Sequence, residues 1–98
     1  MTVYVDDFRV PSTVGGYRAR WSHLFTDDMS DQAELHALAE RIGLRRAWFQ
    51  DAASYPHYDV TDRKRDDAIT AGAVPITWRQ TAAVIRRART NRTGGEPQ

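Results

Sequence analysis

The sequence contains no cysteine and no long apolar run. None of the 98 residues is cysteine, which excludes disulfide bonds and thiolate metal ligands and fits a reducing compartment. No apolar stretch approaches the roughly 18 residues that identify a transmembrane helix. The N-terminus lacks the basic and apolar segments of a secretory signal peptide. We therefore expect a cytoplasmic protein that does not span a membrane.

The sequence also carries little net charge. Its 14 Lys and Arg residues and 13 Asp and Glu residues give a formal net charge of +1. Hydrophobic residues make up 41% of the chain and aromatic residues 10%, which indicates a globular fold rather than a disordered one. The length is that of one domain. We place this domain at residues 1–92 and expect residues 93–98 to form a flexible tail.

Strands and helices are predicted in alternation. Strands are expected where β-branched and aromatic residues cluster, and helices where apolar residues recur every three or four positions. Between the first strand and the first helix, residues 8–29 contain proline and glycine without a sustained period, which predicts a long loop with room for a short extended piece at Tyr17–Trp21. We expect a second loop at residues 51–58. The six elements, in the order β-α-β-α-β-α, are predicted at residues 2–5, 33–42, 46–49, 61–71, 73–76 and 77–89.

Residues that favour helix ends support these boundaries. Ser30 and Thr61 are placed to cap the first two helices, and Gly43 can end the first in a left-handed conformation. Thr77 and Gln80 have the spacing of a capping box at the start of the third helix. Each predicted helix therefore has a residue that can satisfy its terminal backbone groups.

Helices that alternate with strands favour parallel pairing. We therefore predict a small α/β fold of two or three layers, with a short, mainly parallel, three-stranded sheet. Pro75 predicts an edge position for the third strand, because proline donates no ladder hydrogen bond. The predicted core consists of Leu35, Leu38, Ile42, Trp48, Ile76 and Ile85.

Several short motifs resemble one protein family. The opening Met1–Asp7 is similar to the start of that family, and further similar segments follow as far as about residue 76. The family is DUF4031, a domain of unknown function found in bacteria and their phages. The resemblance implies no established activity, and for a phage protein it implies the host cytoplasm. The other similar segments are Trp21–Leu24, Glu34–His36, Ile42–Leu44, Trp48–Gln50 and His57–Asp59.

Polar side chains gather where the predicted strands end. Asp6 and Asp7 directly follow the first strand, and His57 and Asp59 lie in the loop that follows the second. The carboxyl ends of parallel strands form the usual ligand-binding edge of an open sheet, and the long loop can bring His23 to the same edge. We predict that Asp6, His23, His57 and Asp59 form a catalytic site there. Residues predicted to bind a ligand beside it are Asp7, Trp21, Gln50, Tyr58, Arg63 and Lys64.

The residue types suggest chemistry on a phosphate. Asp6 and Asp7 offer carboxylate oxygens to Mg²⁺ or another divalent cation, although either residue can instead cap a turn. His23 and His57 can transfer protons, and a carboxylate beside an imidazole fixes its tautomer. Arg63 lies in the first turn of a helix, where a cation is unfavourable unless it meets an anion.

Positive charge concentrates in the last helix-like stretch, residues 79–92, which contains five arginines and no acidic residue. Such a stripe can bind phosphates or an acidic partner, or it can be a solvated helix face. The arginines are Arg79, Arg86, Arg87, Arg89 and Arg92.

Three functions remain open from the sequence. The first is a small phosphate-handling enzyme that acts on a nucleotide or a nucleic acid and uses a divalent cation. The second is a non-catalytic module that binds a nucleotide or a nucleic acid. The third is a protein-interaction factor of a phage or mobile element. The expected partner in the first two cases is a phosphate-bearing small molecule or nucleic acid.

Overall fold

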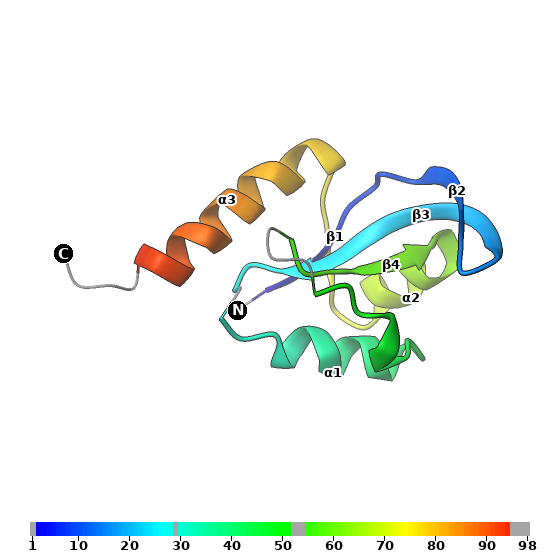
Figure 1. Ribbon diagram of the computed structural model, residues 1–98, viewed down its shortest axis with the longest axis horizontal. Helices are drawn as coiled ribbons and strands as arrows, with labels where there is room; N and C mark the ends of the chain where they lie inside the picture. The colour runs from blue at the N-terminus through cyan, green and yellow to red at the C-terminus, as the bar shows by residue number, and fades with distance from the viewer. Residues whose placement is uncertain (1, 29, 52–54, 95–98) are drawn as a thin grey trace.

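The computed structural model describes residues 2–28, 30–51 and 55–94, and the side chains of residues 89–94 lie outside this description. A five-stranded mixed sheet lies between α1 on one side and α3 on the other (Figure 1). The elements are β1 (Val3–Val5), β2 (Val10–Val14), β3 (Tyr17–Thr26), α1 (Ala33–Arg41), the 3₁₀ helix η1 (Arg46–Trp48), β4 (Tyr58–Thr61), α2 (Asp62–Thr70), β5 (Val74–Pro75) and α3 (Trp78–Gly94).

The long strand β3 organises the sheet. It pairs antiparallel with β2 along its first half, with β1 along its second half, and with β4 on its other edge. Only β5 pairs in parallel, with β1, and it lies at the end of the strand order. The predicted mainly parallel, three-stranded sheet is therefore wrong, whereas the edge position predicted from Pro75 is confirmed.

The predicted loop at residues 8–29 is a β-hairpin. Val14 pairs with Tyr17 across Gly15 and Gly16, and both glycines have positive φ, 58° and 82°. A two-residue turn with positive φ at both positions is the usual hairpin connection. All of β2 is exposed, so its residues show no alternation of apolar and polar side chains. This absence of a pattern is why periodicity predicted a loop.

The second predicted strand is also wrong. Residues 46–48 form the 3₁₀ helix η1, and Trp48 is 51% exposed rather than part of the core. The strand in this region is β4, which begins within the predicted loop and ends at Thr61. A run of four apolar and basic residues is too short to separate a strand from a helical turn.

The helices agree more closely with prediction. Leu35 and Leu38 of α1 are buried as expected, and Gly43 has a φ of 86° at the end of the helix. Thr61 caps α2 by accepting a hydrogen bond from the Lys64 N–H at 3.2 Å. The remaining predictions have mixed outcomes. Ser30 does not cap α1, which has Gln32 at that position, whereas Thr77 and Gln80 form the capping box. Ile42 is buried, Ile76 and Ile85 are half-buried, and residues 95–98 of the predicted tail lie outside the described residues.

The two faces of the sheet differ in character. One face packs against α1 and α2 through a core that includes Leu24, Leu35 and Ala68. Neighbouring strand residues point to opposite faces, so His23 projects away from this core and toward the side of α3. The side that faces α3 is therefore where polar side chains of the sheet can form a site.

No helix in the described part of the chain is both long and apolar enough to cross a membrane.

Candidate functional site

The structure brings together the four residues that were predicted to be catalytic. His23 on β3 lies directly opposite Asp59 on β4, and residues opposite each other in a strand pair project from the same face. His57 precedes Asp59 by two positions and shares that face, and the His23 and His57 ring centroids are 5.2 Å apart. Asp6 follows β1. The cluster lies on antiparallel strands, which corrects the predicted location at the edge of a parallel sheet.

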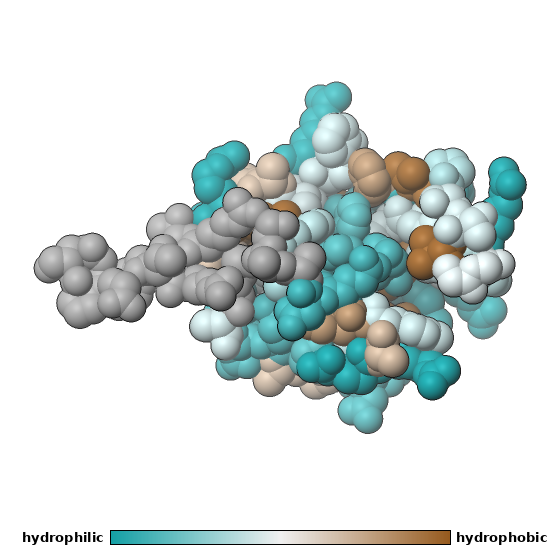
Figure 2. All heavy atoms as spheres, viewed as in Figure 1, coloured by the Kyte–Doolittle hydropathy of each residue, from teal (hydrophilic) through white to brown (hydrophobic). Residues whose placement is uncertain are grey.

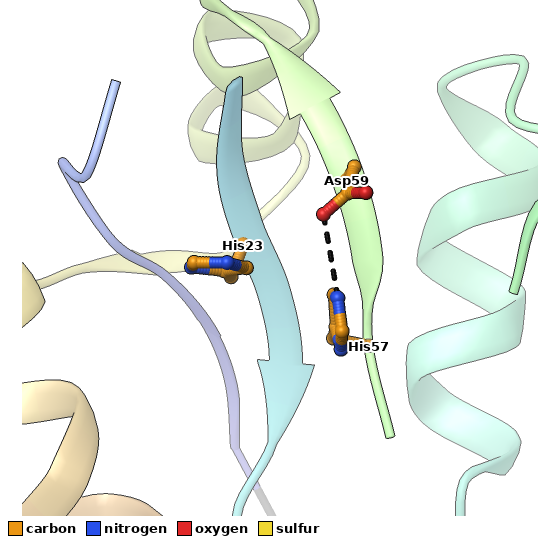
Figure 3. Close-up of side chains that lie close together, drawn as sticks. All are labelled: His23, His57 and Asp59. Carbon is orange, nitrogen blue, oxygen red and sulfur yellow. Dashed lines mark ion pairs between the residues drawn. The ribbon is translucent and has the colours of Figure 1, made fainter. Parts of the chain in front are cut away.

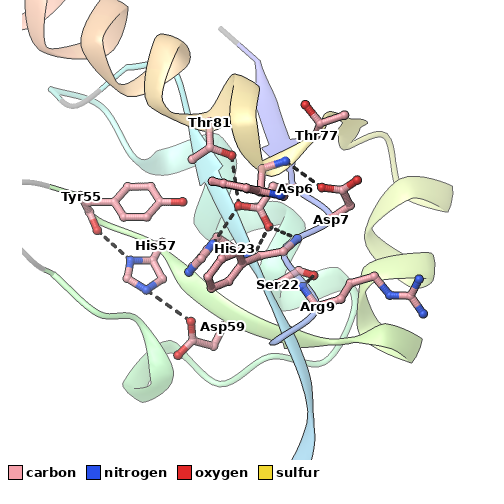
Figure 4. Close-up of polar contacts among 12 residues, drawn as sticks. Asp6, Asp7, Arg9, Ser22, His23, Tyr55, His57, Asp59, Thr77 and Thr81 are labelled. Atoms are coloured by element: carbon pink, nitrogen blue, oxygen red, sulfur yellow. Dashed lines mark hydrogen bonds and ion pairs between the residues drawn. The ribbon is translucent and has the colours of Figure 1, made fainter. Parts of the chain in front are cut away.

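Asp6 is the buried anchor of this cluster. Its side chain is 1% exposed and its oxygens accept four hydrogen bonds (Figure 4). Oδ1 accepts from the backbone N–H groups of His23, at 2.9 Å, and Phe8, at 3.2 Å. Oδ2 accepts from His23 Nδ1 at 2.8 Å and from Thr81 Oγ1 at 3.0 Å. One carboxylate thus links β1, β3 and α3.

Hydrogen bonding also sets the charge of Asp6. Burial by itself raises the pKa of the Asp6 carboxyl, but the hydrogen bonds and the attraction from His23, together with the Phe8 N–H, outweigh burial and lower the pKa. The group is therefore a carboxylate, which only accepts hydrogen bonds. It follows that His23 Nδ1 carries a proton and that the lone pair of a neutral His23 ring lies on Nε2.

His57 is held in the same way by a different oxygen. Its Nδ1 donates to the backbone carbonyl of Tyr55 at 2.7 Å, which places the remaining lone pair, or a second proton, on Nε2. That atom lies 3.3 Å from Asp59 Oδ1. Burial lowers the pKa of His57, but the hydrogen bonds with Asp59 and the Tyr55 carbonyl outweigh it and raise the pKa. A protonated His57 therefore forms an ion pair with Asp59.

Asp59 has a second contact that orients its carboxylate. The side-chain amide of Gln50 donates to Oδ2. Burial raises the pKa of Asp59, but the hydrogen bonds from His57 and Gln50 and the nearby imidazoles outweigh it and lower the pKa. Asp59 is thus charged at neutral pH, with Oδ1 turned toward His57.

Three side chains in this cluster form a potential metal centre. His23, His57 and Asp59 each offer one ligand atom, and these atoms all lie within 4.8 Å of one another (Figure 3). The ligand atoms of a zinc ion lie about 2.0–2.2 Å from the ion, so binding would draw the three atoms closer together. Because Nδ1 of each imidazole already donates to an oxygen, Nε2 of each is the atom that would bind an ion. In His57 the ion would replace the contact of Nε2 with Asp59.

Tyr55 borders the cluster and was missed by the sequence analysis. Its ring stacks on His57, with centroids 4.7 Å apart, and lies 5.4 Å from the His23 ring. Its hydroxyl is buried and has no hydrogen-bond partner among the described residues. Burial, reinforced by Asp6 and Asp59, raises the pKa of this hydroxyl, so it stays protonated and can donate to a ligand.

Replacement of Tyr55 by phenylalanine should therefore not destabilise the free protein. A buried hydroxyl without a partner costs free energy, so the free energy of unfolding should stay the same or rise by about 1 kcal/mol. Tyr58→Phe is the matched control, because the Tyr58 hydroxyl is bonded to His36 Nδ1 at 2.8 Å and its loss should cost about 0.5–1.5 kcal/mol. Urea unfolding of both variants makes the comparison. Equal losses would show that the Tyr55 hydroxyl has a partner.

Three of the predicted ligand-binding residues make structural contacts. Asp7 Oδ1 accepts the first backbone N–H of α3, from Trp78, at 2.7 Å. Tyr58 is 1% exposed and packs in the core. The ammonium group of Lys64 donates to the carbonyl of Ile42 at the end of α1. These contacts account for the three side chains, and their ligand-binding role stays a prediction.

The other three predicted ligand-binding residues, and Lys64 with them, line a groove beside Asp59. The groove has a volume of about 680 Å³. Trp21, Gln50 and Arg63 line it together with Asp59, so the groove and the histidine cluster share one carboxylate. Its remaining lining residues are Val14, Gly15, Tyr17, Leu44, Trp48, Val60, Thr61 and Asp67.

Three more residues that support the cluster have weak sequence signals. Phe8 stacks on His23 with ring centroids 5.2 Å apart, and its position directly after Asp7 in a polar segment was the only hint. Arg65 Nε donates to the backbone carbonyl of Asp6 at 2.7 Å. Thr81 lies on one face of a helix that the sequence analysis assigned to packing and charge alone. These residues hold Asp6 and His23 in place.

The fold and the cluster define a small mixed α/β protein with a histidine–carboxylate site on one face of its sheet. The chain belongs to the family described as "Protein of unknown function (DUF4031)", whose model matches residues 3–88. The family resemblance of the sequence motifs is thereby confirmed. Comparison with curated proteins and with solved structures found no match. Because the family description states no activity, the site itself is the basis for a function.

Proposed function

We propose that this protein is a divalent-metal-dependent hydrolase that acts on a phosphate-bearing substrate of the nucleotide or nucleic-acid class. One observation carries the proposal: the ligand atoms of His23, His57 and Asp59 lie within 4.8 Å of one another, and the Nδ1 atom of both imidazoles is held by an oxygen. Imidazoles that bind metals usually donate their other N–H to a carboxylate or a carbonyl, because this fixes the ring and its tautomer.

The ligand types favour a first-row transition metal. Imidazole nitrogen suits zinc, iron and related ions, whereas magnesium prefers oxygen ligands. We therefore place the ion on His23, His57 and Asp59 in place of the predicted Asp6 and Asp7. The oxygens of Asp6 already accept four hydrogen bonds, and Asp7 caps α3.

The arrangement suits hydrolysis of a phosphate ester. A divalent ion held by His23, His57 and Asp59 would supply Lewis-acid activation of water, because such ions lower the pKa of water toward neutrality. Asp6 orients His23, and Gln50 orients Asp59. Arg63 supplies a positive charge in the adjoining groove for the phosphate. In the overall reaction the water oxygen bonds to phosphorus, the ester P–O bond breaks, and the leaving oxygen takes a proton.

Metal content and hydrolysis measured together test the proposal. The purified protein should bind one equivalent of Zn²⁺ or Mn²⁺ in preference to Mg²⁺, and its Co²⁺ form should show visible d–d absorption. It should hydrolyse a chromogenic phosphate ester, and a chelator should abolish the activity. Asp59→Asn should weaken metal binding by at least about 10-fold, while Asp67→Asn, on the same groove but outside the cluster, should not.

Two results would contradict the proposal. Hydrolysis that is unaffected by a chelator and by Asp59→Asn would exclude the metal centre. A metal-loaded protein that binds nucleotides but hydrolyses no phosphate ester would favour the non-catalytic binding module.

A further inference from the structure

We propose that the groove beside Asp59 binds the base of a single nucleotide, which makes the substrate a nucleoside phosphate. The identity of the reaction rests on the proposed function, whereas the binding does not. The groove volume of about 680 Å³ falls within the roughly 300–1,000 Å³ of small-molecule sites. Such sites are mainly apolar and contain a few polar groups that set the orientation of the ligand.

Aromatic rings form two walls of the groove. Tyr17 and Trp21 come from the β2–β3 hairpin, and their rings meet edge to face with centroids 6.1 Å apart. Trp48 comes from η1. The Trp21 indole N–H donates to the carbonyl of Ser12 at 2.9 Å, which fixes the plane of that ring. Flat rings on separate segments suit a flat heteroaromatic ligand, because every base has a π-face that can stack.

These rings are unusually exposed for their size. Trp48 is 51% exposed and Tyr17 is 62% exposed. Figure 2 shows hydrophobic residues among polar ones over the hairpin end of the molecule, where Val10 and Val14 are exposed too. Burial of such rings against a base would remove apolar surface from water. The exposure therefore marks the hairpin and η1 as surfaces that a ligand can cover.

The groove is lined by Arg63 and Lys64 and by the carboxylates of Asp59 and Asp67, and Arg63 is the cation that can meet a phosphate. Arg63 in the first turn of α2 lines the groove and makes no ion pair with any residue that the structure describes. The neighbouring Asp62 is already paired with Arg9, at 3.0 Å, and with Arg20, at 2.7 Å. Arg63 is thus available to an anion, and the dipole at the N-terminal end of α2 adds to its positive field.

The position of Asp59 connects the groove to the proposed chemistry. Asp59 lines the groove and is also one of the three potential metal ligands. A nucleotide whose base lies against Trp48 and Tyr17 can therefore present its phosphate to Arg63 and to the cluster. The groove volume of about 680 Å³ suits one nucleotide rather than a strand.

Calorimetric binding of four nucleoside 5′-monophosphates and of ribose 5-phosphate tests the inference. The chelator-treated protein, which cannot turn over substrate by the proposed mechanism, should bind the nucleotides, and ribose 5-phosphate should bind at least about fivefold more weakly. Trp48→Ala should weaken nucleotide binding by at least about fivefold and leave ribose 5-phosphate binding unchanged. Trp78→Ala is the matched control, because Trp78 is 50% exposed, like Trp48 at 51%, and does not line the groove.

The outcomes separate this inference from the proposed hydrolase. Nucleotide binding that depends on Trp48, without any hydrolysis, would support this inference and contradict the proposed hydrolase activity. Metal-dependent hydrolysis of a chromogenic ester, together with nucleotide binding that is unchanged by Trp48→Ala, would contradict this inference and support the proposed hydrolase. A single-stranded oligonucleotide that binds far more tightly than any monophosphate, with affinity that falls steeply with salt, would also overturn it in favour of a nucleic-acid substrate.

Discussion

Replacement of Asp6 by alanine should lower the free energy of unfolding by about 3–5 kcal/mol. The Asp6 side chain is 1% exposed and accepts four hydrogen bonds from Phe8, His23 and Thr81. Each buried donor left without a partner costs about 1–3 kcal/mol, and partial relaxation keeps the total below the sum. Because small domains are stable by only about 5–15 kcal/mol, this one substitution should remove a large part of the stability.

Asp7→Ala is the matched control for this expectation. Asp7 neighbours Asp6 in the sequence, but among the residues that the structure describes its side chain accepts only the Trp78 N–H, as a helix cap. Loss of a cap costs about 1 kcal/mol. Urea denaturation followed by circular dichroism measures both losses. Equal losses for the two variants would show that Asp6 is not the anchor between the sheet and α3.

Predictions from the sequence agree with the structure where they depend on neighbouring residues. The capping box of Thr77 and Gln80 and the left-handed Gly43 are set by neighbouring residues, and both appear in the structure. Strand pairing depends on distant residues. The hairpin turn at Gly15 and Gly16 had a local signal in two adjacent glycines, but the exposed β2 lacked the alternation that would have supported it.

The wrong prediction of a mainly parallel, three-stranded sheet has a similar cause. Alternation of helices and strands favours a parallel sheet, and the prediction of a loop in place of β3 removed the strand that makes most of the antiparallel pairs. Once β3 is present, β1 and β4 must pair with it on opposite edges. The only pair that still fits the expected parallel arrangement is β1 with β5.

The members of the site were easier to predict than its support. Asp6, His23, His57 and Asp59 stood out because polar residues gather at predicted strand ends and in the adjoining loops, and the structure places them together. Thr81 lies 75 residues from Asp6, and no local pattern connects the two. Tyr55 is only two residues from His57, but no sequence pattern predicts that the two rings stack on each other.

His57→Ala should leave a folded protein and lower the proposed hydrolysis by at least about 10-fold, because it removes one of the three side chains that would hold the ion. The side chain of His57 is held by the Tyr55 carbonyl, by Asp59 and by stacking on the Tyr55 ring. Its backbone pairs with Gln50, and this pairing remains in the alanine variant.

His36→Ala should have the opposite profile. The His36 ring packs on Phe49 with centroids 4.6 Å apart and is bonded to the buried Tyr58 hydroxyl.

The difference follows from what surrounds each imidazole. Burial, followed by the nearby Arg46, lowers the pKa of His36, so this ring is neutral at physiological pH and serves packing. Its removal opens a gap beside Tyr58 and leaves that hydroxyl without a partner, which should cost about 1–3 kcal/mol. Thermal melts, metal content and hydrolysis rates of both variants provide the comparison. If His57→Ala unfolds the domain while His36→Ala stays folded but inactive, the functional imidazole belongs to α1 and the cluster on β3 and β4 is structural.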